Sequence, residues 1–128
     1  MKKTLGIRHI ALKVCNMEDS IIFYKDILGM EVDWQPDPDN VYLTNGLDNL
    51  ALHKQNNLDL DSEHNRLDHF GIMLKDKADV DSWYNHIKSN NVIVVKELKD
   101  HRDGSRSFYC SDPDNNVVQI IWHPILNK

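Results

Sequence analysis

Two histidines at matched positions are the residues of this sequence best suited to chemistry. His9 and His69 are 60 residues apart, and each stands near the start of a short apolar stretch with the character of a β-strand. Imidazole nitrogen is a common ligand of divalent transition metals. The symmetric placement predicts one metal ion to which both rings contribute. The alternative is that both are polar residues at strand starts, satisfied by the backbone or by water.

The surroundings of the two histidines repeat as well. Sliding the sequence by 60 without a gap places Ile10-Ala-Leu12 on Phe70-Gly-Ile72, and Phe23 on the aromatic Trp83. Further matched pairs are Asn16 with Asp76, Asp19 with Asp79, Tyr24 with Tyr84, Ile27 with Ile87 and Val32 with Val92. The agreement indicates a duplicated supersecondary unit.

Each copy predicts a strand, a helix and three further strands, the order βαβββ. The first helix begins after Asn16, a good N-cap residue, and ends at Gly29, whereas Asp76 opens the second and Asn90-Asn91 ends it. The predicted strands are 7–14, 31–34, 41–44 and 49–54, then 67–74, 93–97, 106–111 and 117–122, with a turn at 36–40. The polar stretch 55–66 is the predicted linker between the copies.

Composition excludes several classes of partner. The 128 residues are 41% hydrophobic and 27% charged, with a net charge of −5. Acidic and basic residues are mixed along the chain with no basic stripe, so we expect no nucleic acid and no membrane as partner. The charged start Met1-Lys-Lys3 is not followed by the apolar run of a signal peptide. For Cys15 and Cys110, free thiols in a reducing cytoplasm are favoured over one disulfide.

Four stretches resemble the vicinal oxygen chelate superfamily, which includes glyoxalase I, fosfomycin-resistance enzymes, extradiol dioxygenases and bleomycin-binding proteins. They are Arg8-His-Ile-Ala-Leu12, Phe23-Tyr-Lys-Asp-Ile-Leu-Gly-Met30, Asp68-His-Phe-Gly-Ile72 and Phe108-Tyr-Cys-Ser-Asp-Pro-Asp-Asn-Asn-Val-Val-Gln119. The resemblance implies an α+β fold in which tandem βαβββ modules form a cup-shaped, eight-stranded mixed sheet with the helices outside. Residues 1–128 would be one glyoxalase/dioxygenase-like domain with modules at about 5–54 and 67–124, assembled as a homodimer.

The same resemblance implies a ligand set for one divalent ion, Zn, Ni, Fe or Mn. The first strands supply His9 and His69, and the last strand supplies Gln119. The corresponding position of the first module falls on Ala51, which has no donor, so His53, two residues on and on the same strand face, is the candidate substitute. Open alternatives are a hydrogen-bonding role for Gln119 and a surface position for His53.

Gln119 stands where the family usually has Glu. A neutral amide removes one negative charge from the ligand set, which lowers metal affinity and makes a bound ion a stronger Lewis acid. It also removes a carboxylate that could move protons, so glyoxalase-type isomerisation and extradiol cleavage are both disfavoured.

Ser107 and Tyr109 resemble the fosfomycin-resistance pattern, in which Ser and Tyr at these places face the ligand. They are predicted to line the cup, Tyr109 as a catalytic residue, with Trp34 as a further substrate contact; core packing is the alternative for Tyr109. The leading hypothesis is a metal-dependent lyase, isomerase or oxygenase that chelates a small molecule through two adjacent oxygens. The rivals are a metal-free drug- or metabolite-binding protein and, as a lesser one, a fosfomycin-resistance-like transferase or hydrolase.

Overall fold

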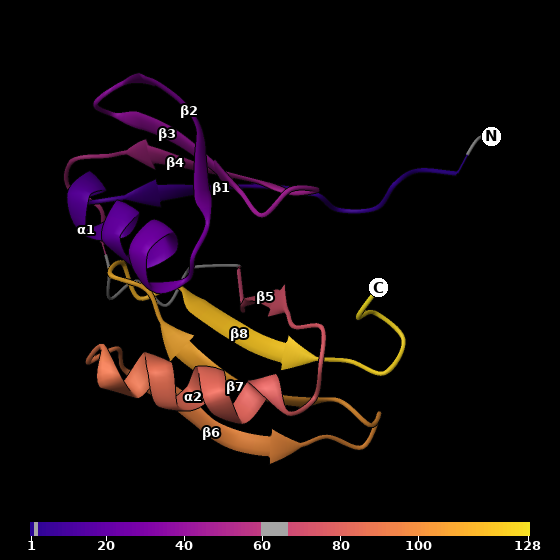
Figure 1. Ribbon diagram of the computed structural model, residues 1–128. Helices are drawn as coiled ribbons and strands as arrows, with labels where there is room; N and C mark the ends of the chain where they lie inside the picture. The colour runs from indigo at the N-terminus through magenta and orange to yellow at the C-terminus, as the bar shows by residue number, and fades with distance from the viewer. Residues whose placement is uncertain (2, 60–66) are drawn as a thin grey trace. The chain divides into compact units, whose positions relative to one another are not determined.

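The computed structural model describes residues 1, 3–59 and 67–128, and the chain divides into two compact units, Met1–Leu60 and Asp61–Lys128. We call them unit 1 and unit 2 and describe each separately (Figure 1). The predicted linker lies partly outside the described residues. No helix in the part of the chain that the structure describes is long and apolar enough to cross a membrane.

Unit 1 has one four-stranded sheet with the order β1-β4-β3-β2, in which β1 and β4 are parallel and the other pairs antiparallel. Its elements are β1 (His9–Val14), α1 (Met17–Ile21), the π-helix η1 (Ile22–Ile27), β2 (Glu31–Asp37), β3 (Asn40–Thr44) and β4 (Asn49–Lys54). Alternation puts Leu12, Val14, Val41, Leu43, Leu50 and Leu52 in the core.

The helical segment of unit 1 begins and ends as the sequence predicts. The Asp19 amide donates to the Asn16 side-chain oxygen at 3.1 Å, which caps the first turn. The Leu28 amide donates to the Phe23 carbonyl, a five-residue step that widens the second half into a π-helix. Gly29, at φ +78°, then reverses the chain in a conformation that favours glycine.

Unit 2 repeats the architecture, with sheet order β5-β8-β7-β6 and β5 parallel to β8. Its elements are β5 (Phe70–Met73), α2 (Asp79–Ser89), β6 (Val94–Asp100), β7 (Arg106–Ser111) and β8 (Val117–Trp122). Helix α2 lies along its sheet, and Tyr84 meets Phe108 edge-on with ring centroids 5.4 Å apart (Figure 1). The α+β class and the two βαβββ modules are therefore confirmed, with the eight strands arranged as two mixed sheets.

Two local predictions are wrong. The second helix begins at Asp79 rather than after Asp76, because the Asp76 carbonyl accepts from the Asp79 amide at 3.1 Å in a preceding turn. Strand β2 continues through Pro36 to Asp37, where a turn is predicted. Proline is tolerated there because β2 is an edge strand with an irregular register between Trp34 and Asp37.

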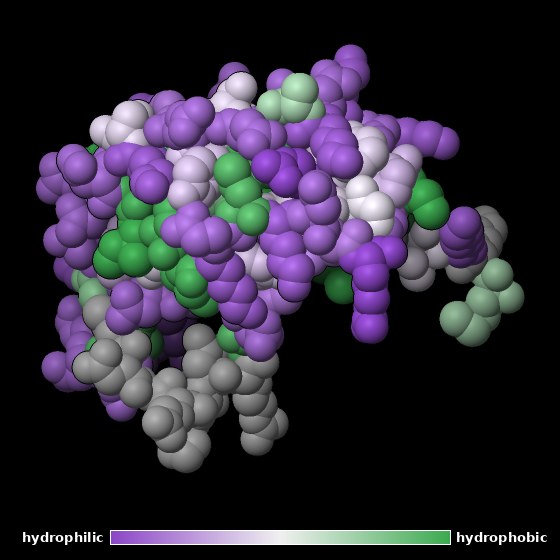
Figure 2. Space-filling model, turned by 90° about the horizontal axis from the view of Figure 1, so that it is seen from below, coloured by the Kyte–Doolittle hydropathy of each residue, from purple (hydrophilic) through white to green (hydrophobic). Residues whose placement is uncertain are grey.

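Exposed apolar side chains are distributed over both units and include Trp34, Ile93 and Val95. The face in Figure 2 is mostly hydrophilic, with green apolar side chains gathered in small clusters between charged ones. The chemically distinctive surface is the sheet face of unit 2 opposite α2.

Candidate functional site

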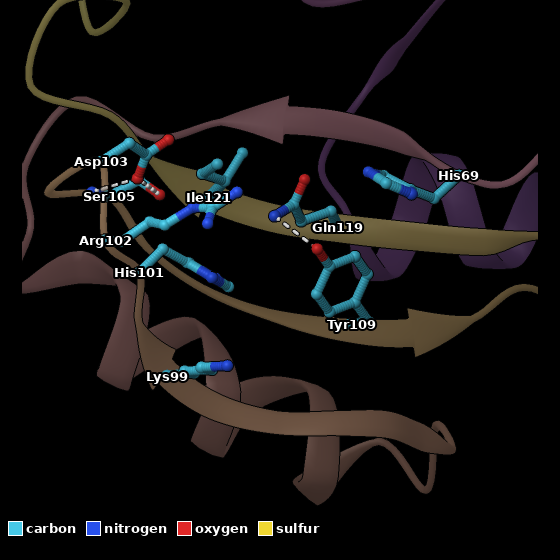
Figure 3. Close-up of a pocket in the computed structure, with 9 residues that line it drawn as sticks. All are labelled: His69, Lys99, His101, Arg102, Asp103, Ser105, Tyr109, Gln119 and Ile121. Carbon is cyan, nitrogen blue, oxygen red and sulfur yellow. Dashed lines mark hydrogen bonds between the residues drawn. The ribbon is translucent and has the colours of Figure 1, made fainter.

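Unit 2 contains a pocket of about 620 Å³ on the face of its sheet that α2 leaves open. The walls are side chains of β6, β7 and β8, of His69 just before β5, and of the loop between β6 and β7 (Figure 3). The lining residues are His69, Lys99, His101, Arg102, Asp103, Ser105, Tyr109, Gln119 and Ile121.

Gln119 lies in the middle of this pocket with one end of its amide fixed. Its Nε2 donates to the Ser107 hydroxyl at 3.0 Å and to the Tyr109 hydroxyl at 3.0 Å. The strand register explains the contacts, because Tyr109 is directly opposite Gln119 and Ser107 is two residues away on the same face. Both protons of the amide nitrogen are thereby used, and Figure 3 shows Oε1 pointing away from Tyr109.

Ser107 connects Gln119 to the loop. Its side chain is fully buried, and its hydroxyl oxygen is 2.6 Å from Nε2 of His101. A chain of hydrogen bonds therefore runs from His101 through Ser107 to Gln119.

His69 is held at the other side of Gln119 by two neighbours. Its Nδ1–H donates to the Asp68 carboxylate at 2.5 Å, and this bond is the main reason that the pKa of Asp68 is below its ordinary value. The ring also meets Tyr109 edge-on at 5.2 Å between centroids. Because Nδ1 carries the proton, the lone pair of the neutral ring is on Nε2.

Positive charge is concentrated around the pocket. Lys99 and Arg102 are in its lining, and Lys96 lies over the Tyr109 ring, 5.1 Å from its centroid. Asp103 faces inward to its own loop, where it accepts from the hydroxyl and the amide of Ser105 at 2.6 and 2.9 Å. Those two bonds lower the pKa of Asp103.

The remaining predicted site residues are in unit 1, on the corresponding sheet face. His9 donates from Nδ1 to Asn49 Oδ1 at 2.7 Å, and His53 donates from Nδ1 to Asn40 Oδ1 at 2.6 Å. Trp34 is 58% exposed and stacks on Tyr42 with ring centroids 5.1 Å apart. The structure thus brings His69, Ser107, Tyr109 and Gln119 together in unit 2, whereas His9, His53 and Trp34 belong to the other unit.

Strand registers identify which residues of the two units correspond. Ala51 pairs with Ala11 and Tyr42, as Gln119 pairs with Gly71 and Tyr109. Ala51 is therefore the counterpart of Gln119, as the sequence predicts.

Sequence reasoning gave no role to Asp68, and it weighed His101 and Arg102 as substrate contacts but favoured solvated or edge positions for them. Asp68 orients His69, while His101 and Arg102 come from the β6–β7 loop, where a sequence offers no periodic pattern from which to infer direction. An acidic residue next to a candidate histidine was the one available signal, because histidine ligands commonly donate their second nitrogen to a carboxylate.

The donors of unit 2 fit a metal ion. His69 offers an unprotonated Nε2, and Gln119 offers Oε1 with its amide nitrogen already engaged, so both can face an ion as lone-pair donors. Within residues 1, 3–59 and 67–128, no three His, Cys, Asp or Glu side chains are grouped closely enough to hold a metal. Gln119 is outside those residue types, so the candidate set rests on an amide.

Comparisons with known proteins agree on one family. The model of the Glyoxalase/Bleomycin resistance protein/Dioxygenase superfamily matches residues 6–120. The metallothiol transferase FosB of Staphylococcus haemolyticus is 30% identical over 116 residues, which cover 90% of this chain and 81% of that enzyme. A trivalent organoarsenical cleaving enzyme of Bacillus sp. strain MD1 is 29% identical over 124 residues, covering 89% of this chain and 71% of that enzyme.

Solved structures show the same fold. A lactoylglutathione lyase from Agrobacterium tumefaciens superposes with a TM-score of 0.79 at 24% identity, covering 99% of this chain and 100% of that one. A glyoxalase/bleomycin resistance protein/dioxygenase from Alicyclobacillus acidocaldarius superposes with a TM-score of 0.73 at 25% identity, covering 97% and 96%. These relatives carry different activities, so the reaction has to be argued from the site.

Proposed function

Because this chain belongs to the Glyoxalase/Bleomycin resistance protein/Dioxygenase superfamily, a group of vicinal oxygen chelate proteins, we propose that unit 2 holds a divalent metal and acts on a small oxygenated anion. The observation that supports this most is the orientation of two donors. Asp68 fixes the His69 ring with Nε2 unprotonated, and Ser107 and Tyr109 fix the Gln119 amide with Oε1 free to face the pocket. Such outer hydrogen bonds are what metal ligands need in order to be held in place.

The charge around the pocket supports an anionic substrate. Lys99 and Arg102 each add a positive charge to the lining, and the one carboxylate there, Asp103, is engaged by Ser105. A guanidinium can bind a carboxylate or phosphonate through two parallel hydrogen bonds. The pocket therefore favours a small molecule with an anionic group beside the oxygens that bind the metal.

Tyr109 is proposed as the catalytic hydrogen-bond donor. Its hydroxyl accepts from Gln119 Nε2, so its own proton is not used by Gln119 and can be donated to a substrate oxygen. A bound metal would supply Lewis-acid stabilisation of negative charge on substrate oxygens. Tyr109 would stabilise the same charge from the protein side, in a site that His69 and Gln119 border.

Group transfer is the reaction type that this residue set supports best. Isomerisation needs a base to move a proton between carbons, and Gln119 is neutral. In a transfer, a nucleophile supplied by a second substrate forms a bond to the electrophilic atom while the bond from that atom to a substrate oxygen breaks, and the Tyr109 hydroxyl can donate its hydrogen bond to that leaving oxygen. The chain itself then need only polarise the electrophile. The similarity to proteins named metallothiol transferases supports this choice.

A metal-free binding protein is the second candidate function. The observation that favours it is Ala51, the counterpart of Gln119, which offers no donor in unit 1. In that case the hydroxyls, the amide and the cations of unit 2 would hold a small molecule without altering it.

Calorimetric titration with Mn²⁺ and Zn²⁺ separates the two candidates. We expect wild type to bind one equivalent and His69→Ala to lose at least tenfold in affinity, since a ligand is removed. His86→Ala is the matched control, because His86 is exposed on α2 outside this pocket. No binding by any of the three proteins would favour the metal-free function, and equal affinities would show that a bound metal does not use His69.

The sequence-based roles of unit 1 remain predictions. His9 and His53 are the further predicted ligands and Trp34 the further predicted substrate contact, and alanine variants in the same titration test the two histidines. A homodimer and a cytoplasmic location, both expected from the sequence, also remain proposals.

A further inference from the structure

We propose that His123 is a positioning residue that keeps the Asp103 carboxylate away from Arg102, so that Arg102 stays available for an anionic ligand. The inference rests on the proposed binding of a small anion in the pocket of unit 2. It concerns a residue that directly follows β8 and is not among those that line the pocket.

Asp103 is a competitor for that anion's place. It lines the same pocket as Arg102 and Lys99, and it directly follows Arg102 in the chain. Among the residues that the structure describes, neither Arg102 nor Lys99 has a hydrogen bond or ion pair through its side chain. A carboxylate that turned to the guanidinium would form an ion pair and cancel the charge that the pocket offers. The direction of the Asp103 side chain therefore decides whether Arg102 can bind an anion.

The two oxygens of the Asp103 carboxylate face different groups. Oδ1 accepts from the amide of Ser105 at 2.9 Å and from its hydroxyl at 2.6 Å. Oδ2 is 3.6 Å from Nε2 of His123. Figure 3 shows the carboxylate turned toward Ser105, whereas the Arg102 side chain extends the other way. Ser105 thus holds one oxygen, and His123 is the group that faces the other.

A backbone amide determines which form of His123 faces Asp103. The Ile125 amide donates to Nδ1 of His123 at 3.1 Å. A peptide N–H can only donate, so Nδ1 is unprotonated and the neutral ring carries its proton on Nε2. His123 therefore presents an N–H to the carboxylate, and that N–H attracts Oδ2 to the side away from the pocket.

The segment after β8 holds His123 against the loop between β6 and β7. The side-chain amide of Asn127 donates to the His123 carbonyl at 2.9 Å. Pro124 lies close to Gly104 of the loop, since a Cβ at Gly104 would be 3.4 Å from Cγ of Pro124. The His123 side chain is only 19% exposed. These contacts fix the ring relative to the loop that carries Asp103.

Two substitutions separate the roles of the two ring nitrogens. His123→Gln keeps an N–H near the place of Nε2, so it can still face Asp103. His123→Asn keeps an acceptor near the place of Nδ1 for the Ile125 amide, but it is too short to reach the carboxylate. Each is combined with Asp103→Asn, which removes the competing charge. The probe is inorganic phosphate at constant pH and ionic strength, with binding followed by NMR at the Arg102 Nε–H.

We expect His123→Asn to weaken phosphate binding by about threefold to fivefold, near the upper end of what an exposed ion pair contributes. In the Asp103→Asn background the same change should cost less than about 1.5-fold, because no carboxylate is left to turn. His123→Gln should bind phosphate as wild type does. Equal losses in both backgrounds would mean that His123 only supports the loop, and would overturn the proposal.

A second measurement needs no ligand. An ion pair with Asp103 protects the Arg102 Nε proton, so its exchange with water should be slower in His123→Asn than in wild type and His123→Gln. Unchanged exchange in His123→Asn would also overturn the proposal, and thermal melts identify any variant that fails to fold. If wild type binds no phosphate, the anionic substrate of the proposed function fails, while the exchange rates still decide the role of His123.

Discussion

Gln119→Glu is the substitution whose consequences can be worked out most fully from the structure. A carboxylate at this position is not left unpaired, because the Ser107 and Tyr109 hydroxyls that now accept from Nε2 at 3.0 Å can rotate and donate instead. His101 would follow by carrying its proton on Nε2 and donating to Ser107. The two hydrogen bonds to position 119 therefore survive with their directions reversed, and the one between Ser107 and His101 is kept.

The expected change in stability is small. A hydrogen bond to a charged group contributes about 1.5–3 kcal/mol against about 1 kcal/mol for a neutral one, so the two reversed bonds gain roughly 1–4 kcal/mol. Desolvation of a half-buried carboxylate costs several kcal/mol, which is of similar size. We therefore expect a net change within about 1 kcal/mol, or a shift of about 4 °C in Tm for a chain of this length.

The expected change in metal affinity is large by comparison. A charged oxygen added to the donors of His69 should tighten Mn²⁺ or Zn²⁺ binding at least tenfold, about 1.4 kcal/mol. Calorimetric titrations and thermal melts of both proteins measure the two quantities. Gln55→Glu is the matched control, since Gln55 is exposed in the other unit and the charge change is the same. A variant destabilised by more than about 3 kcal/mol with no gain in metal affinity would refute this reasoning.

Three further outcomes are expected. Burial raises the pKa of Cys110 to about 12, so this thiol should resist a disulfide reagent at pH 8 until the protein unfolds. The stability that comes from burying the neutral thiol should be lost as pH rises from about 9 to about 12, because only the folded state keeps the proton in that range. Asp112→Ala should lower the free energy of unfolding by about 3 kcal/mol in a denaturant titration, because the buried carboxylate accepts from the amides of Asp114 and Asn116 and from the Asn116 side chain. Gly71→Ala should change stability by less than about 1 kcal/mol, since the added Cβ meets no atom closer than 3.4 Å, and a larger loss on thermal melting would contradict this.

The strands that could be placed from the sequence are those with the clearest periodicity. The predicted bounds of β4, β7 and β8 agree with the structure, because short stretches with buried apolar residues at alternate positions, flanked by turn residues such as Asn, Asp and Gly, leave little freedom in where a strand begins and ends. The same alternation placed Ser107 and Tyr109 on one strand face, and the structure joins both to Gln119.

A constant offset of 60 does not align the two units along their whole length. The separation between corresponding residues grows from 60 between Ala11 and Gly71 to 68 between Ala51 and Gln119. The growth begins before β6, so Val32 corresponds by register to Val94 and not to Val92, and the longer β6–β7 loop then adds most of the remainder. A constant offset cannot detect such an insertion, and the insertion supplies His101 and Arg102 to the pocket.

The two units share one scaffold but carry different side chains at corresponding positions. At corresponding registers, unit 1 has Trp34 stacked on Tyr42 beside Ala51, whereas unit 2 has Lys96 over Tyr109 beside Gln119. Ala51 carries only a methyl group, which has no donor or acceptor to orient, and the turn between β2 and β3 in its unit has two residues. The amide of Gln119 has two chemically different ends, and the unit that carries it also carries the longer loop, whose His101 forms a hydrogen bond with Ser107. Ser107 therefore connects the loop to the glutamine, because its buried hydroxyl contacts both His101 and Gln119.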